Sequence, residues 1–226
     1  MGLFDSVLKS VGNSVKNSAA NSIKQAAGNS LSRAAQTAAS KAVNNAADSI
    51  SKKVGHAISN KSKKFTYASL PNNVDELKSL PGADMKDEFA VASFVILALC
   101  MYPSNREVAI QMIDYLNGPE EVGARERQFI NDRFMDGKDY IPKSYFKGAT
   151  PDNNYTPDVP YTIEVTENPY SRESEGYVTL WLESGGADSP RFVKLRNKPS
   201  TGQWFVWDFE GLLAGIRQPV STDKWA

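Results

Sequence analysis

The chain of 226 residues contains 26 basic and 26 acidic side chains, one histidine and one cysteine, Cys100. A single cysteine excludes an internal disulfide, and one histidine and one cysteine supply too few ligands for a zinc site of the usual kind. The zero net charge is a cancellation, because residues 1–64 hold ten of the basic side chains and only two of the acidic ones. We therefore expect a basic extension, residues 1–64, followed by an acidic globular domain, residues 65–226.

Residues 1–64 have the composition of a long amphipathic helix. They are rich in Ala, contain no Pro, and have Phe4 as their single aromatic residue. Drawn as a helix, the large apolar side chains of the first turns fall within an arc of about 140°, and lysines lie opposite. This pattern is typical of a helix that folds on an anionic membrane surface. The expected membrane-binding residues are Leu3, Phe4, Val7, Leu8, Lys9, Val11, Val15, Lys16 and Lys24.

The first residues also resemble known peptides. The opening Gly2-Leu3-Phe4-Asp5-Ser6-Val7-Leu8-Lys9 is similar to the short membrane-active amphipathic peptides of amphibian skin that begin G-L-F-D. This resemblance implies a helix that seeks a surface. No secretory signal is visible, and the longest apolar stretch, 89–102, is shorter than the ~20 residues that span a bilayer. We expect a cytoplasmic protein, peripheral on the inner face of a membrane.

Two other partners for residues 1–64 stay open. The helix could pair with copies of itself to give a homo-oligomer, or it could pack against its own domain. Nucleic acid is not expected as a partner, because the basic residues are spread around the helix and no aromatic platform for bases accompanies them.

The next part of the chain, about residues 85–137, has the patterns of helices. The first is apolar nearly all round, which indicates a helix buried at the centre of the domain. The motif Ser104-Asn105-Arg106-Glu107 reads as a capping box that opens the second helix, and Gly118 with Pro119 ends it. A loop rich in Pro, Asn and Asp, 148–160, follows the third. The expected helices span 85–101, 108–116 and 122–137.

The last part of the domain, about residues 161–209, has the patterns of strands. Apolar and polar residues alternate in four segments separated by Gly, Pro and Asn turn signals. A short closing helical turn is expected at 211–216. Helices followed by a meander predict an α+β fold with a four-stranded antiparallel sheet. The expected strands are 161–166, 177–183, 192–196 and 204–209.

The strand half also carries a family resemblance. The run Trp204-Phe205-Val206-Trp207-Asp208-Phe209-Glu210-Gly211-Leu212-Leu213, followed by Ile216-Arg217-Gln218-Pro219, resembles an uncharacterised domain family of Gram-positive bacteria over about residues 75–220. The resemblance implies a bacterial cytoplasmic setting. The family has no assigned activity, so the resemblance implies no functional residue.

The pattern of reactive side chains argues against an enzyme. The only histidine, His56, lies in the basic extension, whereas Cys100 lies in the buried helix, so a Cys–His pair is not expected. No phosphate-binding glycine motif is present. The strand carboxylates and the acidic loop 152–158 are more typical of exposed polar residues than of a glycosidase pair or a calcium site. We expect no catalytic residue, no cofactor and no metal.

One face of the predicted sheet is a candidate binding surface. If the aliphatic residues of the second and third strands face the helices, an aromatic and cationic set points away. That set is Tyr177, Trp181, Phe192, Lys194 and Arg196. Such a face suits a protein partner, a glycan or a peptide, unless the loop 148–160 or the N-terminal helix covers it.

Together these patterns predict a non-enzymatic peripheral membrane protein, whose basic N-terminal helix docks on anionic lipid and whose acidic domain is a binding module. The alternative is a soluble interaction module whose N-terminal helix self-associates or packs on its own sheet.

Overall fold

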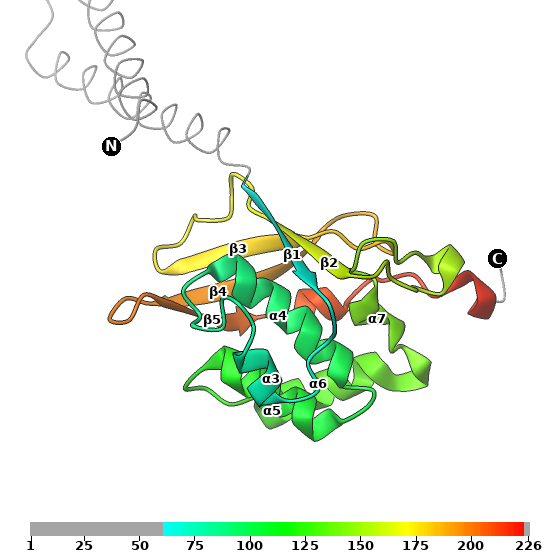
Figure 1. The fold of residues 1–226 in the computed structure, drawn as a ribbon, viewed down its shortest axis with the longest axis horizontal. Coiled ribbons are helices and arrows are strands. Elements are labelled where there is room, and N and C mark those ends of the chain that lie inside the picture. The colour runs from blue at the N-terminus through cyan, green and yellow to red at the C-terminus, as the bar shows by residue number, and fades with distance from the viewer. Residues whose placement is uncertain (1–60, 224–226) are drawn as a thin grey trace, which may run out of the picture. The chain divides into compact units, whose positions relative to one another are not determined.

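The computed structural model describes residues 61–223, so the long N-terminal helix and its expected membrane-binding residues lie outside the described part. Residues 61–223 fold as an α+β domain, which is the predicted class (Figure 1). The sheet lies on one side of helix α4 (Glu88–Met101). Helices α3 (Val74–Lys78), α5 (Arg106–Asn117) and α6 (Ala124–Phe134) lie on the other. No helix within this range is both long and apolar enough to cross a bilayer.

Helix α4 is the centre of the core. Its side chains from Phe89 to Leu99 are all buried, including the one polar residue, Ser93, which hydrogen-bonds Tyr67 Oη at 2.6 Å. The helix begins at Glu88 and not at Met85, because Met85 has a left-handed backbone (φ 63°) and Asp87 accepts a hydrogen bond from Phe89 N as the N-cap. Sequence therefore predicts the buried helix but places its start three residues early.

Helix α5 (Arg106–Asn117) packs against α4 and ends as predicted at Gly118, whose φ is +77°. Its start differs from the prediction. The N-cap is Asn105, which accepts a hydrogen bond from Val108 N at 3.2 Å, and not Ser104. Asn and Ser are equally good caps, so the sequence does not decide between neighbours.

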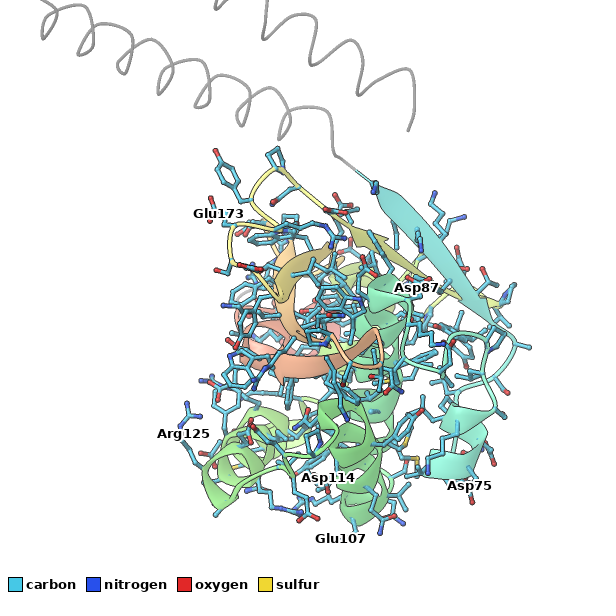
Figure 2. The ribbon with its side chains drawn as sticks, turned by 90° about the vertical axis from the view of Figure 1, so that its left-hand side faces the viewer. Asp75, Asp87, Glu107, Asp114, Arg125 and Glu173 are labelled. Atoms are coloured by element: carbon cyan, nitrogen blue, oxygen red, sulfur yellow. The ribbon has the colours of Figure 1, made fainter. Side chains whose placement is uncertain are left out.

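Short helices and turns complete the helical layer. Figure 2 shows Asp75, Glu107 and Arg125 projecting outward from this side of the domain. The third predicted helix is α6, the loop 148–160 contains the turn η3, and the closing turn is η4. The bounds are α3 (Val74–Lys78), α6 (Ala124–Phe134), α7 (Tyr140–Lys143), η2 (Met135–Gly137), η3 (Pro151–Asn153), η4 (Glu210–Leu213) and η5 (Val220–Thr222).

The sheet is antiparallel and its strand order follows the chain, β1-β2-β3-β4-β5. All five strands contact α4, so the curved sheet wraps around one helix. The side chains turned towards α4 supply about a quarter of the residues of the core. The strands are β1 (Ser62–Tyr67), β2 (Tyr161–Thr166), β3 (Tyr177–Leu182), β4 (Arg191–Lys198) and β5 (Gln203–Asp208).

The prediction of four strands is wrong by one, because β1 was not recognised. Its first residues, Ser62 to Lys64, have the composition of the basic extension, and within the strand only Phe65 and Tyr67 are apolar. It nevertheless pairs with β2 along its whole length, from Ser62 opposite Thr166 to Tyr67 opposite Tyr161. An edge strand has one neighbour and needs little apolar surface, so alternation is a weak signal for it.

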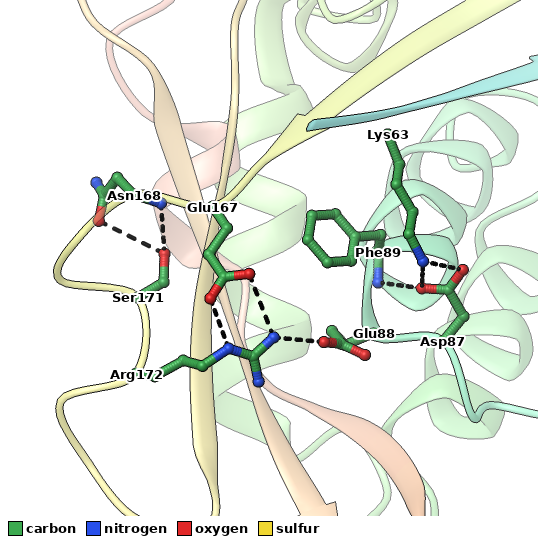
Figure 3. A network of polar contacts seen from close by, with 8 residues as sticks. All are labelled: Lys63, Asp87, Glu88, Phe89, Glu167, Asn168, Ser171 and Arg172. Atoms are coloured by element: carbon green, nitrogen blue, oxygen red, sulfur yellow. Dashed lines mark hydrogen bonds and ion pairs between the residues drawn. The ribbon is translucent and has the colours of Figure 1, made fainter. Parts of the chain in front are cut away.

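A polar network joins β1, the start of α4 and the β2–β3 connection (Figure 3). Arg172 donates from Nε to Glu167 Oε1 at 2.5 Å and from Nη2 to Glu88 Oε1 at 2.5 Å. Lys63 Nζ lies 2.9 Å from both carboxylate oxygens of Asp87. The hydrogen bond to Glu167 raises the pKa of Arg172 further, so the cation is held firmly in its charged form. The network fixes the β2–β3 connection on the N-terminus of α4.

Candidate functional site

The outer face of the sheet is the side turned away from α4. In β3 and β4, residues alternate between the two sides. Those turned towards α4 are fully buried: Val178, Leu180, Leu182, Val193 and Leu195. Those on the outer face are half-buried or exposed: Tyr177, Trp181, Phe192, Lys194 and Arg196. The five residues singled out by the sequence therefore lie together on one face.

Cations and aromatic rings contact one another on this face. Lys194 Nζ lies 4.8 Å from the ring centroid of Tyr177, and the Arg196 guanidinium carbon lies 5.3 Å from that of Trp207. Tyr177 and Trp207 meet edge to face at 5.7 Å. Neither Lys194 nor Arg196 forms an ion pair with any residue from 61 to 223. Cation–π contacts orient the two charges and leave them available to an anion.

A second aromatic pair, Trp181 and Phe192, lies farther along the same two strands. The residues are paired across the strands, and their rings meet edge to face at 5.7 Å. The indole Nε1 of Trp181 is buried and has no hydrogen-bond partner among the described residues. The ring of Phe192 packs close to Gly211, beside η4. This pair is covered more than the Tyr177–Trp207 end, which leaves the latter as the accessible part of the outer face.

A β-bulge exposes Trp207. Leu195 pairs with Val206 but Lys194 pairs with Asp208, so β5 has one more residue than β4 at this point, and that residue is Trp207. A bulge twists its strand and redirects the extra side chain. Trp207 is 45% exposed as a result, whereas Val206 beside it is buried. Large exposed aromatic side chains are typical of recognition surfaces.

Beside Trp207 lies a hollow that we call the β5 groove. It has a volume of about 350 Å³ and runs between the end of α5 and the outer ends of β4 and β5. A neighbouring hollow of about 200 Å³ shares its wall at Asn117, Glu120 and Trp207 and extends the groove past Glu121 and Glu126. Arg196, Lys198 and Phe205 also line the β5 groove.

The close approach of α5 to β5 depends on Gly118. A Cβ atom at this position would lie 2.5 Å from the ring of Phe205, and the φ of +77° is unfavourable for other residues. The contact brings Asn117, the last residue of α5, to the wall of the groove. Its side-chain Oδ1 is buried without a hydrogen-bond partner among residues 61–223. A buried acceptor without a partner costs ~1–3 kcal/mol, so a ligand that donates a hydrogen bond to it would gain affinity.

The charges of the groove are separated. Arg196 and Lys198 lie on the β4 side, and Glu120 and Glu121 follow the end of α5. None of the four forms an ion pair with another described residue. The groove thus has a cationic side and an anionic side, each available to a ligand.

A larger cavity, of about 500 Å³, lies at another part of the domain, and several of its polar groups are engaged in hydrogen bonds. Ser184 Oγ donates to Ser144 Oγ at 2.7 Å, and Ser144 Oγ donates to a backbone carbonyl. Glu164 accepts hydrogen bonds from Ser62 and Lys64, which hold the pKa of its carboxyl below the usual range. A general acid needs the opposite shift, so Glu164 is poorly suited to that role.

The other candidate reactive groups are also engaged or separated. Several carboxylates are paired with arginine, as Glu167 is with Arg172 and Glu210 with Arg125 at 2.7 Å. Burial raises the pKa of the Cys100 thiol to about 12, which keeps it protonated and unreactive. His56 lies outside the described residues. Within residues 61–223, no cluster of three or more His, Cys, Asp or Glu side chains could hold a metal ion.

The groove contains residues that the sequence did not single out. Phe205 and Trp207 alternate along a strand that was correctly predicted, so their place on the outer face could have been deduced with the others. Asn117 and Glu120 follow a predicted helix, and nothing in the sequence indicates which strand they approach. Their role depends on tertiary packing.

Fold and groove together define a small α+β domain with an aromatic and cationic sheet face. The chain belongs to the family described as a domain of unknown function (DUF6935), which matches residues 69–220. This match confirms the resemblance of the C-terminal region to an uncharacterised domain family. No curated protein and no solved structure matches the chain. Strand β1 lies before the matched range, so the described domain extends beyond it on the N-terminal side.

Proposed function

We propose that residues 61–223 form a non-enzymatic binding module whose ligand site is the β5 groove with the adjoining outer face. We further propose that residues 1–60 hold this module on an anionic membrane surface, at the cytoplasmic side. The observation that carries the first part is the convergence of unpaired charges, exposed aromatic rings and an unsatisfied amide at one hollow. Separate features of this kind are common, whereas their concentration is typical of recognition sites.

The absence of catalysis is supported by the engagement of polar groups elsewhere. Buried hydroxyls hydrogen-bond one another, and strand carboxylates are held by arginine or lysine. In the groove itself, the charged side chains are arranged to bind and orient. A nucleophile with an adjacent base is the arrangement that catalysis would require.

The membrane part is supported by the sequence of residues 1–64, with its amphipathic pattern and its excess of basic residues. The charge of the outer face also favours it over packing of residues 1–64 on their own sheet. Lys194 and Arg196 would repel a basic segment at that face. An anionic bilayer attracts such a segment, with about 1 kcal/mol for each basic residue near the surface.

Co-sedimentation with vesicles tests the membrane part. We expect the full-length protein to pellet with anionic vesicles and to remain in solution with neutral ones. Replacing Phe4 and Leu8 by Asp should abolish pelleting, because two charges would enter the apolar face. The matched control replaces Ser6 and Asn13 by Asp, which adds the same charge to the polar face and should weaken binding only slightly.

Two results would contradict the membrane assignment. One is pelleting that the Phe4 and Leu8 substitutions leave unchanged. The other is a protein that stays in solution with anionic vesicles and forms oligomers by light scattering, which would instead support a soluble module that self-associates through residues 1–64.

A further inference from the structure

We propose that the β5 groove binds a polypeptide segment that carries both an acidic and a basic side chain, with one of its peptide groups paired to Asn117. This inference rests on the proposed function of the domain as a binding module, and it names the chemistry of the ligand.

The side chain of Asn117 indicates that the ligand contains a peptide group. Its amide has one acceptor and two donor positions, and the acceptor, Oδ1, is buried without a hydrogen-bond partner in the described range. A peptide group presents one N–H donor and one C=O acceptor, so it can satisfy a side-chain amide from both sides. Because Asn117 ends α5 beside the edge strand β5, an extended segment could reach it along the groove.

The separated charges of the groove indicate a ligand that carries both a positive and a negative charge. Arg196 and Lys198 suit a carboxylate, and Glu120 and Glu121 suit an ammonium or guanidinium group. A ligand with only one sign of charge would be attracted to one side and repelled by the other. A segment with both signs satisfies each side without leaving a charge unpaired.

The same charges argue against other ligand classes. The phosphates of a nucleic acid or of a lipid surface would meet Glu120 and Glu121 at the helical side of the groove. An uncharged sugar would leave all four charged groups of the groove without a partner. Residues 1–60 of this chain carry many basic but few acidic side chains. They could therefore pair with Glu120 and Glu121 but would rarely offer a carboxylate to Arg196 and Lys198.

The apolar part of the groove gives the ligand a place for a side chain. Phe205 is half-buried and Trp207 is 45% exposed, and both line the hollow together with prolines at its two ends. Flat aromatic walls beside a polar anchor are the usual way in which a small site obtains affinity. The charged groups would then fix the direction of the chain.

Nuclear magnetic resonance of the full-length protein tests this assignment. The probes are short capped peptides made of Glu, Lys, Leu and Gly, with Glu and Lys at graded separations and in both orders. Control peptides replace Glu by Gln, Lys by Gln, or both. We expect a mixed-charge peptide to shift the side-chain amide signals of Asn117 and the indole signal of Trp207. Each control peptide should bind more weakly, by about tenfold or more.

Substitutions then identify the groove as the site. Arg196→Glu, Glu120→Lys and Asn117→Leu should each weaken the binding of the mixed peptide by about tenfold. Lys147→Glu is the matched control, because Lys147 is an exposed lysine that lines the separate cavity and neither the groove nor the outer face. Combining Arg196→Glu with Glu120→Lys should restore binding to a peptide of reversed order. Urea unfolding of each variant verifies that it is folded.

The outcomes separate this inference from the proposed function. A neutral peptide that binds as tightly as the mixed one, or a Lys147→Glu variant as weak as Arg196→Glu, would overturn the inference. If no peptide binds but a single-stranded oligonucleotide or an oligosaccharide shifts the same two signals, the peptide is excluded and the binding module stands. If none of these classes shifts them, both the peptide and the groove as a ligand site are refuted.

Discussion

Replacing Arg172 by Met should destabilise the domain far more than its place on a surface loop suggests. The guanidinium is 41% exposed, but the Glu167 carboxylate that it holds is only 3% exposed. Removing the cation leaves that carboxylate buried without its partner. Breaking a fully buried pair costs about 3–5 kcal/mol, and an exposed pair contributes about 0–1 kcal/mol.

The half-exposed position of Arg172 places the expected loss between these limits, at about 2–3 kcal/mol. Glu88 loses its hydrogen bond at the same time, but its side chain is 16% exposed and reaches water more easily. With a urea dependence of about 1–3 kcal/mol per M for a small domain, the midpoint of unfolding should fall by about 1 M or more. Tryptophan fluorescence and circular dichroism measure it.

Two variants isolate the cause of this loss. Adding Glu167→Gln to Arg172→Met removes the buried charge and should recover part of the stability. Arg125→Met breaks the ion pair with Glu210 at the surface, where Arg125 is 77% exposed, and should leave the midpoint unchanged. If Arg172→Met behaves like Arg125→Met, or if the double variant is as weak as the single one, the burial argument is refuted.

Two further predictions concern the core and the groove. Burial raises the pKa of Tyr67 and of Cys100 to about 12, above their values in the unfolded chain. The free energy of unfolding should therefore be constant up to about pH 9 and fall towards pH 12, because these groups ionise on unfolding. Urea midpoints that stay level to about pH 12 would refute this. Gly118→Ala should lower the stability by about 1–3 kcal/mol, because the new Cβ would lie 2.5 Å from the ring of Phe205 and the backbone is left-handed. The control Gly137→Ala has a similar φ of +72° but no atom within 4 Å of the new Cβ, so it should lower the stability less. Equal losses of stability in the two variants would mean that the backbone alone is responsible.

The parts of the fold that the sequence predicts are those that local physics determines. The buried helix α4 is apolar on all sides, and Gly118 ends α5 because few other residues accept its backbone. Strands β3 and β4 alternate cleanly, which places their outer residues on one face. Strand β1 is not predicted from the sequence, because half of it is basic and polar like the segment before it. Only its pairing with β2 makes it a strand.

The candidate site could be predicted only in part, for a similar reason. Alternation identifies Arg196 and, had it been applied to β5, Phe205 and Trp207. It does not identify the bulge that exposes Trp207, since a bulge depends on the register of two strands. Nor does it identify Asn117, whose neighbours are chosen by the packing of α5 on β5. A groove between a helix end and a sheet edge exists only at the tertiary level.

The proposed membrane-binding segment and the β5 groove are attached to opposite edges of the sheet, which leads to a last prediction. Residues 1–60 join the domain at the start of β1, one edge of the sheet, and the groove lies at β5, the other edge. Binding at the two edges should be independent, because three strands separate the edges and coupling requires an element that both ligands bias. The affinity for the mixed peptide should therefore be the same with and without anionic vesicles. A loss of affinity with vesicles would mean that Arg196 and Lys198 contact lipid themselves, and a gain would mean that membrane docking through β1 reorganises the sheet.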